Sequence, residues 1–284
     1  AAVGDPLVAV VVAGSYGEGT GQCVAVSGGV GSGLWSHGQA PADDLELLVV
    51  VNAPKRTILK LLEPVSRKYS AILKVPVNFV GILDEAGLAR VRPTLAWYEL
   101  VQAHHMLFGS ERVFDALKRR LGILADGCAD PDFPPDEAQW IHTLSGFRAM
   151  TWFGGDGRRS TLQTVLYYQA VRGLGDAVLV QRGSWSVERA KREATILALA
   201  SGDEWFAGRP EDTRQFLDLY RAAVGWFNGA HRCSDGSKPD HSLSAVQAPD
   251  LGAFARAWLL VADSLYAKQT VVGEKRIPLI RRLI

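Results

Sequence analysis

The N-terminal region places a glycine-rich turn between two apolar stretches. The sequence LVAVVVA (Leu7–Ala13) runs directly into GSYGEGTG (Gly14–Gly21), and a second apolar stretch, DLELLVVV (Asp44–Val51), follows after an insert. Both apolar stretches are rich in valine, which is typical of β-strands. Side chains alternate between the two faces of a strand, so we expect Asp44 and Glu46 to lie on the same face of the second strand.

Two carboxylates on one face at a strand end predict a metal site. They repel each other unless a cation lies between them, and Mg²⁺ binds carboxylate oxygens while sharing its coordination with a substrate phosphate. A glycine-rich turn beside them allows the backbone to approach that phosphate and to direct N–H groups at it. The candidate residues are Gly14, Ser15, Tyr16 and Gly17 for the phosphates, and Asp44 and Glu46 for Mg²⁺.

The same stretch resembles the nucleotidyltransferase superfamily, which has the polymerase-beta-like fold. The family signature is a Gly-Ser turn followed by an Asp-x-Asp or Asp-x-Glu strand, and the match here is Gly14-Ser15 with Asp44-x-Glu46. The longer match GSYGEG, with an insert before DLELLVV, looks like a bacterial subgroup of nucleotidyltransferase-domain proteins of unassigned substrate. Leu95–Leu100, leading to Leu107–Gly109, and Gly173–Leu179 read similarly. The resemblance covers about the first two-fifths of the chain well and the rest loosely.

This resemblance implies a magnesium-dependent nucleotidyltransferase. Such an enzyme transfers a nucleoside monophosphate from a nucleoside triphosphate to a hydroxyl acceptor, which the sequence does not identify. In that interpretation Gly14 and Ser15 hold the β- and γ-phosphates, while Asp44 and Glu46 hold Mg²⁺.

The third metal carboxylate of the family lies on a later strand, where it helps to activate the acceptor hydroxyl. The corresponding position here is Asn78, or Pro76 if the register differs by two residues, and neither side chain can supply a negative charge. The alternative hypothesis is therefore a catalytically degenerate member that binds a nucleotide or a protein partner.

Composition favours a cytoplasmic protein. Of the 284 residues, 48% are hydrophobic and 21% are charged, which is enough for a sizeable core in one large or two ordinary domains. The net charge of +1 makes nucleic acid an unlikely partner and gives no reason to expect a membrane partner. Cys23, Cys128 and Cys233 are an odd, widely spaced set that suits reduced thiols. No apolar run approaches the ~20 residues that a bilayer requires, and Gly4-Asp5-Pro6 interrupts any signal peptide.

The periodicity of apolar residues is β-rich up to Leu83 and helical beyond it. The predicted strands are Leu7–Ala13, Gln22–Val26, Leu34–Ser36, Leu45–Val51 and Ile72–Leu83, the second and third forming a hairpin. Lys55–Tyr69 is predicted to be a helix, and Asp84 to cap a short one. The later predicted helices are Thr94–Leu107, Glu111–Leu121, Asp136–Phe153, Arg158–Gln181, Ser186–Ser201, Glu211–Asn228 and Asp250–Val272.

A break rich in glycine and proline at Ala125–Pro135 indicates a domain boundary. We expect a nucleotidyltransferase-like domain over residues 1–125 and a helical domain over residues 126–284. The predicted fold class is α+β, with a small mixed β-sheet domain followed by a helical bundle.

Other polar clusters are better interpreted as ordinary structural positions. Adjacent His104 and His105 on a helix point about 100° apart and do not readily share a metal. The loop set His231, Cys233, Asp235 and His241 matches no zinc spacing. Glu99 could face the active-site cleft that the family resemblance implies, and Arg148, Arg158 and Arg159 could bind a triphosphate. Solvated charge is commoner at such positions.

The last residues of the sequence mix basic and apolar side chains. Lys275, Arg276, Arg281 and Arg282 could contact nucleic acid or an acidic partner. Because Ile277, Leu279, Ile280, Leu283 and Ile284 are interleaved with them, we favour a docked segment whose charges snorkel into solvent.

Overall fold

The computed structural model describes residues 7–13, 23–25, 39–41, 45–53, 55–73, 76–123, 131–153, 161–186, 188–199, 209–231 and 250–266. Its content is mixed α/β, as predicted, with a small mixed sheet and mostly helical residues. The chain divides into two compact units. The sheet unit is Ala1–Pro134 with Ser160–Val165 and Trp226–Ser244, and the helical unit is Pro135–Arg159, Leu166–Gly225 and Ala245–Ile284. The expected boundary at residues 125 and 126 lies outside the described residues.

Four strands form one mixed sheet in the order β5-β4-β1-β6. They are β1 (Leu7–Val12), β4 (Leu45–Val51), β5 (Val77–Leu83) and β6 (His105–Phe108). β1 is antiparallel to both β4 and β6, whereas β4 and β5 are parallel. A parallel pair requires a crossover connection, and α2 (Lys55–Leu73) provides it.

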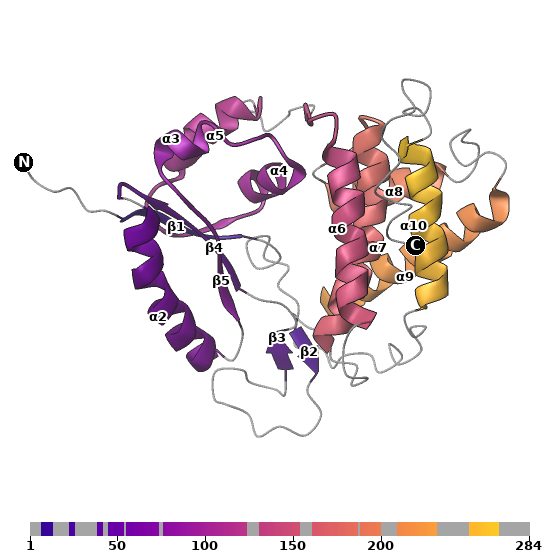
Figure 1. The fold of residues 1–284 in the computed structure, drawn as a ribbon, viewed down its shortest axis with the longest axis horizontal. Coiled ribbons are helices and arrows are strands. Elements are labelled where there is room, and N and C mark those ends of the chain that lie inside the picture. Colours follow the sequence, from indigo (N-terminus) through magenta and orange to yellow (C-terminus); the bar gives the residue numbers. More distant parts are fainter. Residues whose placement is uncertain are drawn as a thin grey trace, which may run out of the picture. The chain divides into compact units, whose positions relative to one another are not determined.

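Both faces of the sheet contribute to the core. On one face, Val49, Val51 and Ile82 pack with Ile58 of α2. On the other face Leu48 and Val50 are fully buried. Figure 1 shows α2 on one side of the sheet and α3 (Glu85–Leu88), α4 (Leu95–Gln102) and α5 (Asp115–Arg120) on the other.

The insert between the two motif strands contains a hairpin, as expected, but its returning strand differs from the prediction. β2 (Cys23–Ala25) pairs with β3 (Gln39–Pro41), and Ala25 lies opposite Gln39. The predicted returning strand, Leu34–Ser36, falls in the connection between β2 and β3 and outside the described residues. The glycine-rich pattern therefore indicated a hairpin but placed the strand pairing too early.

The predicted helix Thr94–Leu107 is also shorter than expected. α4 ends at Gln102, the following Ala103 has non-helical dihedral angles, and His105–Phe108 forms β6 against β1. Pairing with an open strand edge outweighs the local helical pattern, because the backbone groups of that edge need partners. Gly109 then adopts a φ of +96°, and a Cβ there would collide with Val8 and Ala9.

Two smaller differences concern neighbouring elements. α2 extends to Leu73, so the next strand begins at Val77 and not at Ile72. The predicted helix Glu111–Leu121 is a 3-10 turn, η1 (Glu111–Phe114), followed by α5. The predicted cap is confirmed, since the Asp84 carboxylate accepts the N–H of Gly87 at the start of α3.

Five long helices follow near their predicted positions. They are α6 (Glu137–Phe153), α7 (Thr161–Gln181), α8 (Arg189–Leu199), α9 (Pro210–His231) and α10 (Leu251–Tyr266). Glycines of α7 permit close approach to two neighbours: a Cβ at Gly173 would collide with Ser145 of α6, and one at Gly175 would lie 2.5 Å from the Tyr220 ring of α9. The stretch Gly173–Leu179 thus serves helix packing.

Candidate functional site

The described part of the predicted site lies at one end of the strands, where β1 ends and where β4 and β5 begin. The Ala13 N–H, directly after β1, donates a 2.9 Å hydrogen bond to the Glu46 carbonyl oxygen in β4. On the other side of β4, the Leu45 N–H donates a 2.8 Å hydrogen bond to the Pro76 carbonyl oxygen. Ala13, the residue before Gly14 in the sequence, therefore lies beside Glu46, and the start of β5 lies on the opposite side of β4.

Glu46 of β4 and Asn78 of β5 are register partners at this end of the strands. β4 and β5 align Leu45 with Val77, Glu46 with Asn78 and Leu47 with Phe79. Register partners in neighbouring strands point to the same face, and the face of Leu47 is the one that packs against Leu73 of α2. Glu46 and Asn78 consequently lie on the face opposite α2. Glu46 is half-buried there and Asn78 is exposed.

Two serines of α2 hold the start of β5 in this register. The Ser66 hydroxyl donates a 2.6 Å hydrogen bond to the Val77 carbonyl oxygen, and the Ser70 hydroxyl accepts one of 2.8 Å from the Val77 N–H. Because Pro76 bonds toward β4, the backbone groups of Val77 point toward the open edge of the sheet. The serines satisfy those groups in place of a further strand, which also protects the edge from pairing. Ser66 and Ser70 therefore help to place Asn78 beside Glu46.

The other predicted motif residues, which are Gly14, Ser15, Tyr16, Gly17 and Asp44, lie outside the described residues. Ala13 and Leu45, which adjoin them in sequence, lie inside. Within the described part of the chain, no three His, Cys, Asp or Glu side chains gather in a way that could hold a metal ion.

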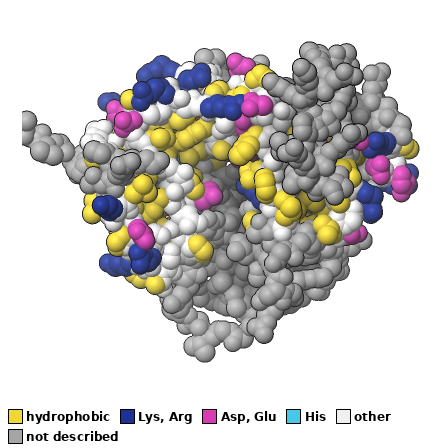
Figure 2. All heavy atoms as spheres, viewed as in Figure 1, with side chains coloured by type: hydrophobic (Ala, Val, Ile, Leu, Met, Phe, Trp, Pro, Cys, Tyr) yellow, Lys and Arg dark blue, Asp and Glu magenta, His cyan; other side chains and the backbone are white. Residues whose placement is uncertain are grey.

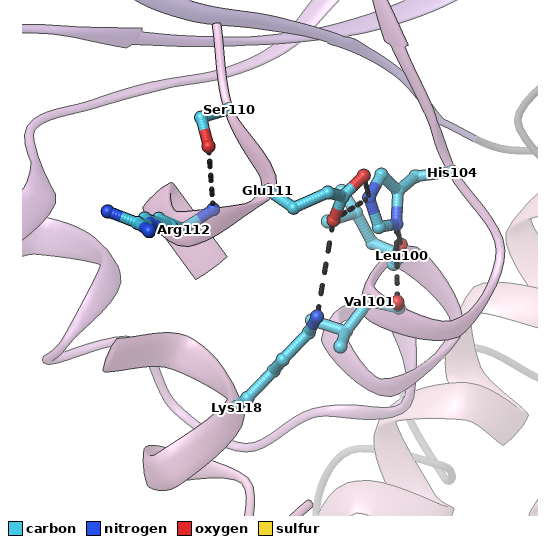
Figure 3. Close-up of polar contacts among 7 residues, drawn as sticks. All are labelled: Leu100, Val101, His104, Ser110, Glu111, Arg112 and Lys118. Atoms are coloured by element: carbon cyan, nitrogen blue, oxygen red, sulfur yellow. Dashed lines mark hydrogen bonds and ion pairs between the residues drawn. The ribbon is translucent and has the colours of Figure 1, made fainter. Parts of the chain in front are cut away.

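His104 is a structural residue at the end of α4 (Figure 3). Its Nδ1 lies 3.0 Å and 3.2 Å from the carbonyl oxygens of Leu100 and Val101, and its Nε2 lies 2.9 Å from both carboxylate oxygens of Glu111. Lys118 of α5 approaches the same carboxylate at 4.0 Å. Both ring nitrogens are thus engaged, so His104 ties α4 to η1 and α5 and offers no nitrogen for catalysis. His105 is exposed at the start of β6.

The stretch Leu95–Leu100, which shares the family resemblance, also has a packing role. Tyr98 is buried, its hydroxyl donates a 2.9 Å hydrogen bond to the Leu121 carbonyl oxygen, and it accepts one from the Asp132 N–H. Burial raises the pKa of Tyr98, so the ring remains a neutral bridge across the sheet unit. Its neighbour Glu99 is half-buried on α4.

The other predicted polar candidates are not brought together among the described residues. Arg148 is half-buried on α6, and His231 is the last residue of α9. Their expected partners, Arg158, Arg159, Cys233, Asp235 and His241, lie outside the described residues.

The helical unit contains a buried ion pair that the sequence did not reveal. Arg192 of α8 is only 4% exposed, its guanidinium lies 3.4 Å from the Asp176 carboxylate of α7, and it stacks 5.0 Å from the Trp185 ring. Burial chiefly, and also the nearby Asp176, raise the pKa of Tyr220. Sequence spacing carries no signal for this pair, because its members belong to different helices.

A second polar contact joins α6 to α10. The His142 Nε2 donates to the Trp258 carbonyl oxygen at 3.0 Å, the Trp258 indole N–H donates to the His142 carbonyl oxygen at 3.3 Å, and the two rings stack 4.4 Å apart. His142 is 1% exposed, and burial lowers its pKa. The contact fixes the two helices against each other.

No protein-family model and no curated protein sequence matches this chain. None of the helices in the described ranges is long and apolar enough to span a bilayer.

Proposed function

We propose that this chain is a Mg²⁺-dependent nucleotidyltransferase that transfers a nucleoside monophosphate from a nucleoside triphosphate to a hydroxyl acceptor. The observation that carries the proposal is the position of Glu46. It is half-buried near the start of the inner strand β4, and its carbonyl oxygen accepts the N–H of Ala13, the residue directly before Gly14 in the sequence. A carboxylate in that position is well suited to hold a metal ion beside phosphates bound by the turn.

The proposal assigns a role to each motif residue. Asp44 and Glu46 hold Mg²⁺, while the backbone N–H groups of Gly14–Gly17 contact the triphosphate. The metal ion neutralises charge that develops on the transferring phosphoryl group and on the leaving pyrophosphate. In the same proposal the small sheet domain precedes a helical domain.

A second function is favoured by one specific observation, the register pairing of Glu46 with Asn78. An amide cannot accept the proton of an acceptor hydroxyl as a carboxylate does, and it adds no charge to hold a second metal ion. With Asn78 in the position of the third acid, the chain binds the nucleotide without efficient transfer and acts as a nucleotide-binding or protein-interaction module.

Calorimetry with non-reacting nucleotides tests the shared binding step. Nucleotidyl transfer breaks the bond between the α-phosphorus and its bridging oxygen, so α,β-methylene analogues of the four ribonucleoside triphosphates bind without turnover. We expect Mg²⁺-dependent binding of at least one analogue, weakened tenfold or more by Glu46→Ala. Glu63→Ala is the matched control, because Glu63 is an exposed glutamate of α2 that pairs with Arg67 of the same helix. Binding that is absent for all four analogues, or equal in the presence of EDTA, contradicts the proposal.

Turnover of the natural triphosphates separates the two functions. Release of pyrophosphate with a panel of hydroxyl acceptors supports the transferase. Tight Mg²⁺-dependent binding without pyrophosphate release supports the binding module.

A further inference from the structure

The helix α6 carries a row of exposed apolar side chains. Trp140, Leu144, Phe147 and Met150 are 61%, 36%, 58% and 58% exposed. They recur every three or four residues and so lie along one side of the helix, which we call the α6 stripe. In Figure 2, hydrophobic side chains gather on the face of the molecule where Figure 1 shows α6.

The α6 stripe has the size of an apolar patch that often serves a function, and it is smaller than one side of a stable dimer interface. Its four side chains expose on the order of 400 Å² if each fully exposed side chain has about 200 Å². Apolar patches of this size commonly mark an interaction site. A stable interface between two protein molecules buries about 800 Å² on each partner. A segment of the same chain needs less area, because its effective concentration at the stripe is high.

The chain leaves α10 next to this stripe. Tyr266 is the last residue of α10, and its ring lies 6.1 Å from the ring of His142 in α6. Its hydroxyl is hydrogen-bonded to the side chain of Thr143, the residue directly before Leu144. The backbone of Tyr266 therefore lies about the length of one tyrosine side chain from Thr143, which is beside the middle of the α6 stripe.

The sequence after Tyr266 suits an apolar surface. Residues 267–284 contain five basic side chains and seven large apolar ones, which are Val271, Val272, Ile277, Leu279, Ile280, Leu283 and Ile284. Eighteen residues reach up to roughly 60 Å, whereas the stretch of α6 from Trp140 to Met150 spans about 15 Å of helix. Both composition and length allow this segment to cover the stripe.

We propose that the segment Ala267–Ile284 folds back onto the α6 stripe and covers it. Its Ile, Leu and Val side chains contact Trp140, Leu144, Phe147 and Met150. Its lysines and arginines extend their charged ends into solvent, as long basic side chains do beside apolar surfaces.

Tryptic cleavage of the full-length chain tests this contact. Trypsin cuts after the basic residues of the segment, and the loss of C-terminal peptides is followed by intact mass. Trp140→Asp places a charge on the stripe, and we expect it to speed this cleavage tenfold or more. Trp140→Leu keeps the stripe apolar and should retain slow cleavage. Leu59→Asp is the matched control, because Leu59 is a 46% exposed leucine in the sheet unit, and it should leave the cleavage rate unchanged.

A tail-side variant keeps the test valid even if Trp140→Asp disturbs α6. Leu279→Asp with Leu283→Asp leaves α6 untouched, and we expect the same acceleration of cleavage. Combining these changes with Trp140→Asp should add nothing, because both sides of one contact are already lost. The proposal is wrong if the wild type is already cleaved as fast as both variants. It is also wrong if the effects of the two sets of changes on the cleavage rate multiply in the combined variant. A dimer in light scattering that Trp140→Asp dissociates overturns it in favour of a second copy.

Discussion

Glu46 of β4 and Asn78 of β5 are register partners in a parallel strand pair, and they lie on the face of the sheet opposite α2. A carboxylate in place of Asn78 would put two like charges side by side, which is unfavourable unless a cation lies between them. The amide removes that repulsion and with it one ligand for a second metal ion. Binding of Mg²⁺ and catalysis can therefore be separated experimentally at this one position.

Asn78→Asp is expected to increase nucleotidyl transfer. General-base assistance contributes roughly 10²–10⁴-fold to a rate, so even partial recovery should raise Mg²⁺-dependent pyrophosphate release tenfold or more. Asn52→Asp is the matched control, since Asn52 is exposed just after the other end of β4. Brisk release by the wild type with no gain in Asn78→Asp would show that another group supplies the acid.

Asp44→Ala is expected to weaken Mg²⁺-dependent triphosphate binding. Loss of one metal-bridged contact should lower the affinity tenfold or more, about 1.4 kcal/mol, as measured by calorimetry with an α,β-methylene analogue. Asp43→Ala is the matched control, because it removes the same charge from the preceding residue of the sequence. Equal affinities of Asp44→Ala and the wild type, or equal losses in both variants, would rule out a specific metal role for Asp44.

Ser70→Ala is expected to loosen the start of β5. The Val77 N–H, bonded to the Ser70 hydroxyl at 2.8 Å, would lose its partner in a part-buried position, which destabilises the folded state by about 1–3 kcal/mol. Amide exchange measured by NMR should show faster exchange at Val77 and its neighbours in β5. Thr195→Ala is the control, because that hydroxyl bonds only a carbonyl of its own helix. Unchanged exchange in β5 would mean that the serines do not set the register.

Secondary structure was predictable wherever local pattern and tertiary context agree. The valine-rich runs of β1 and β4 and the apolar spacing of α2 and α6 each depend on one element packing on a common core. β6 was not predicted, because its local sequence pattern is helical. It forms a strand because it pairs with the backbone of β1, which lies about a hundred residues earlier in the sequence. Local periodicity contains no information about such an edge.

For the candidate site, the structure confirms only the strand at Glu46, which lies in β4, and its register sets Asn78 beside Glu46. Strand alternation and glycine chemistry predict the role of Asp44 and of the turn, which lie outside the described residues. The serine contacts to Val77 and the His142–Trp258 pair were not predictable, because each joins residues from different elements. The position of His142 in the core cannot be read from α6 alone, since that helix is apolar on most sides.

Gly175→Ala is expected to destabilise the helical unit. The added Cβ would lie 2.5 Å from the Tyr220 ring, which is itself buried, and overpacking of this kind typically costs about 1–3 kcal/mol. Gly225→Ala is the matched control, because a Cβ there meets no atom within 4 Å and lies within α9. We expect it to stabilise the protein by about 0.5–1 kcal/mol through helix propensity. Thermal unfolding measures both, and two shifts of the same sign would contradict the packing role of Gly175.

The helical unit is expected to lose stability in mild acid through His142. In the folded state burial lowers the pKa of His142 from its usual 6.5, and its Nδ1 has no hydrogen-bond partner in the described part of the chain. The unfolded chain therefore binds a proton more readily than the folded one. The stabilisation is fully present above pH 6.5 and is lost progressively below it, until the folded-state pKa is reached.

The slope of this loss is up to about 1.4 kcal/mol per pH unit. Chemical unfolding of the wild type and of His142→Phe at pH 7.5, 6.5 and 5.5 measures it, and the difference between the two proteins cancels groups they share. We expect His142→Phe to be less stable at pH 7.5, because the Trp258 carbonyl loses its donor, and the gap to close as the pH falls. His105→Gln, at an exposed position, should keep the wild-type dependence. A gap that stays constant from pH 7.5 to 5.5 would mean that His142 takes up its proton equally well in the folded and unfolded states.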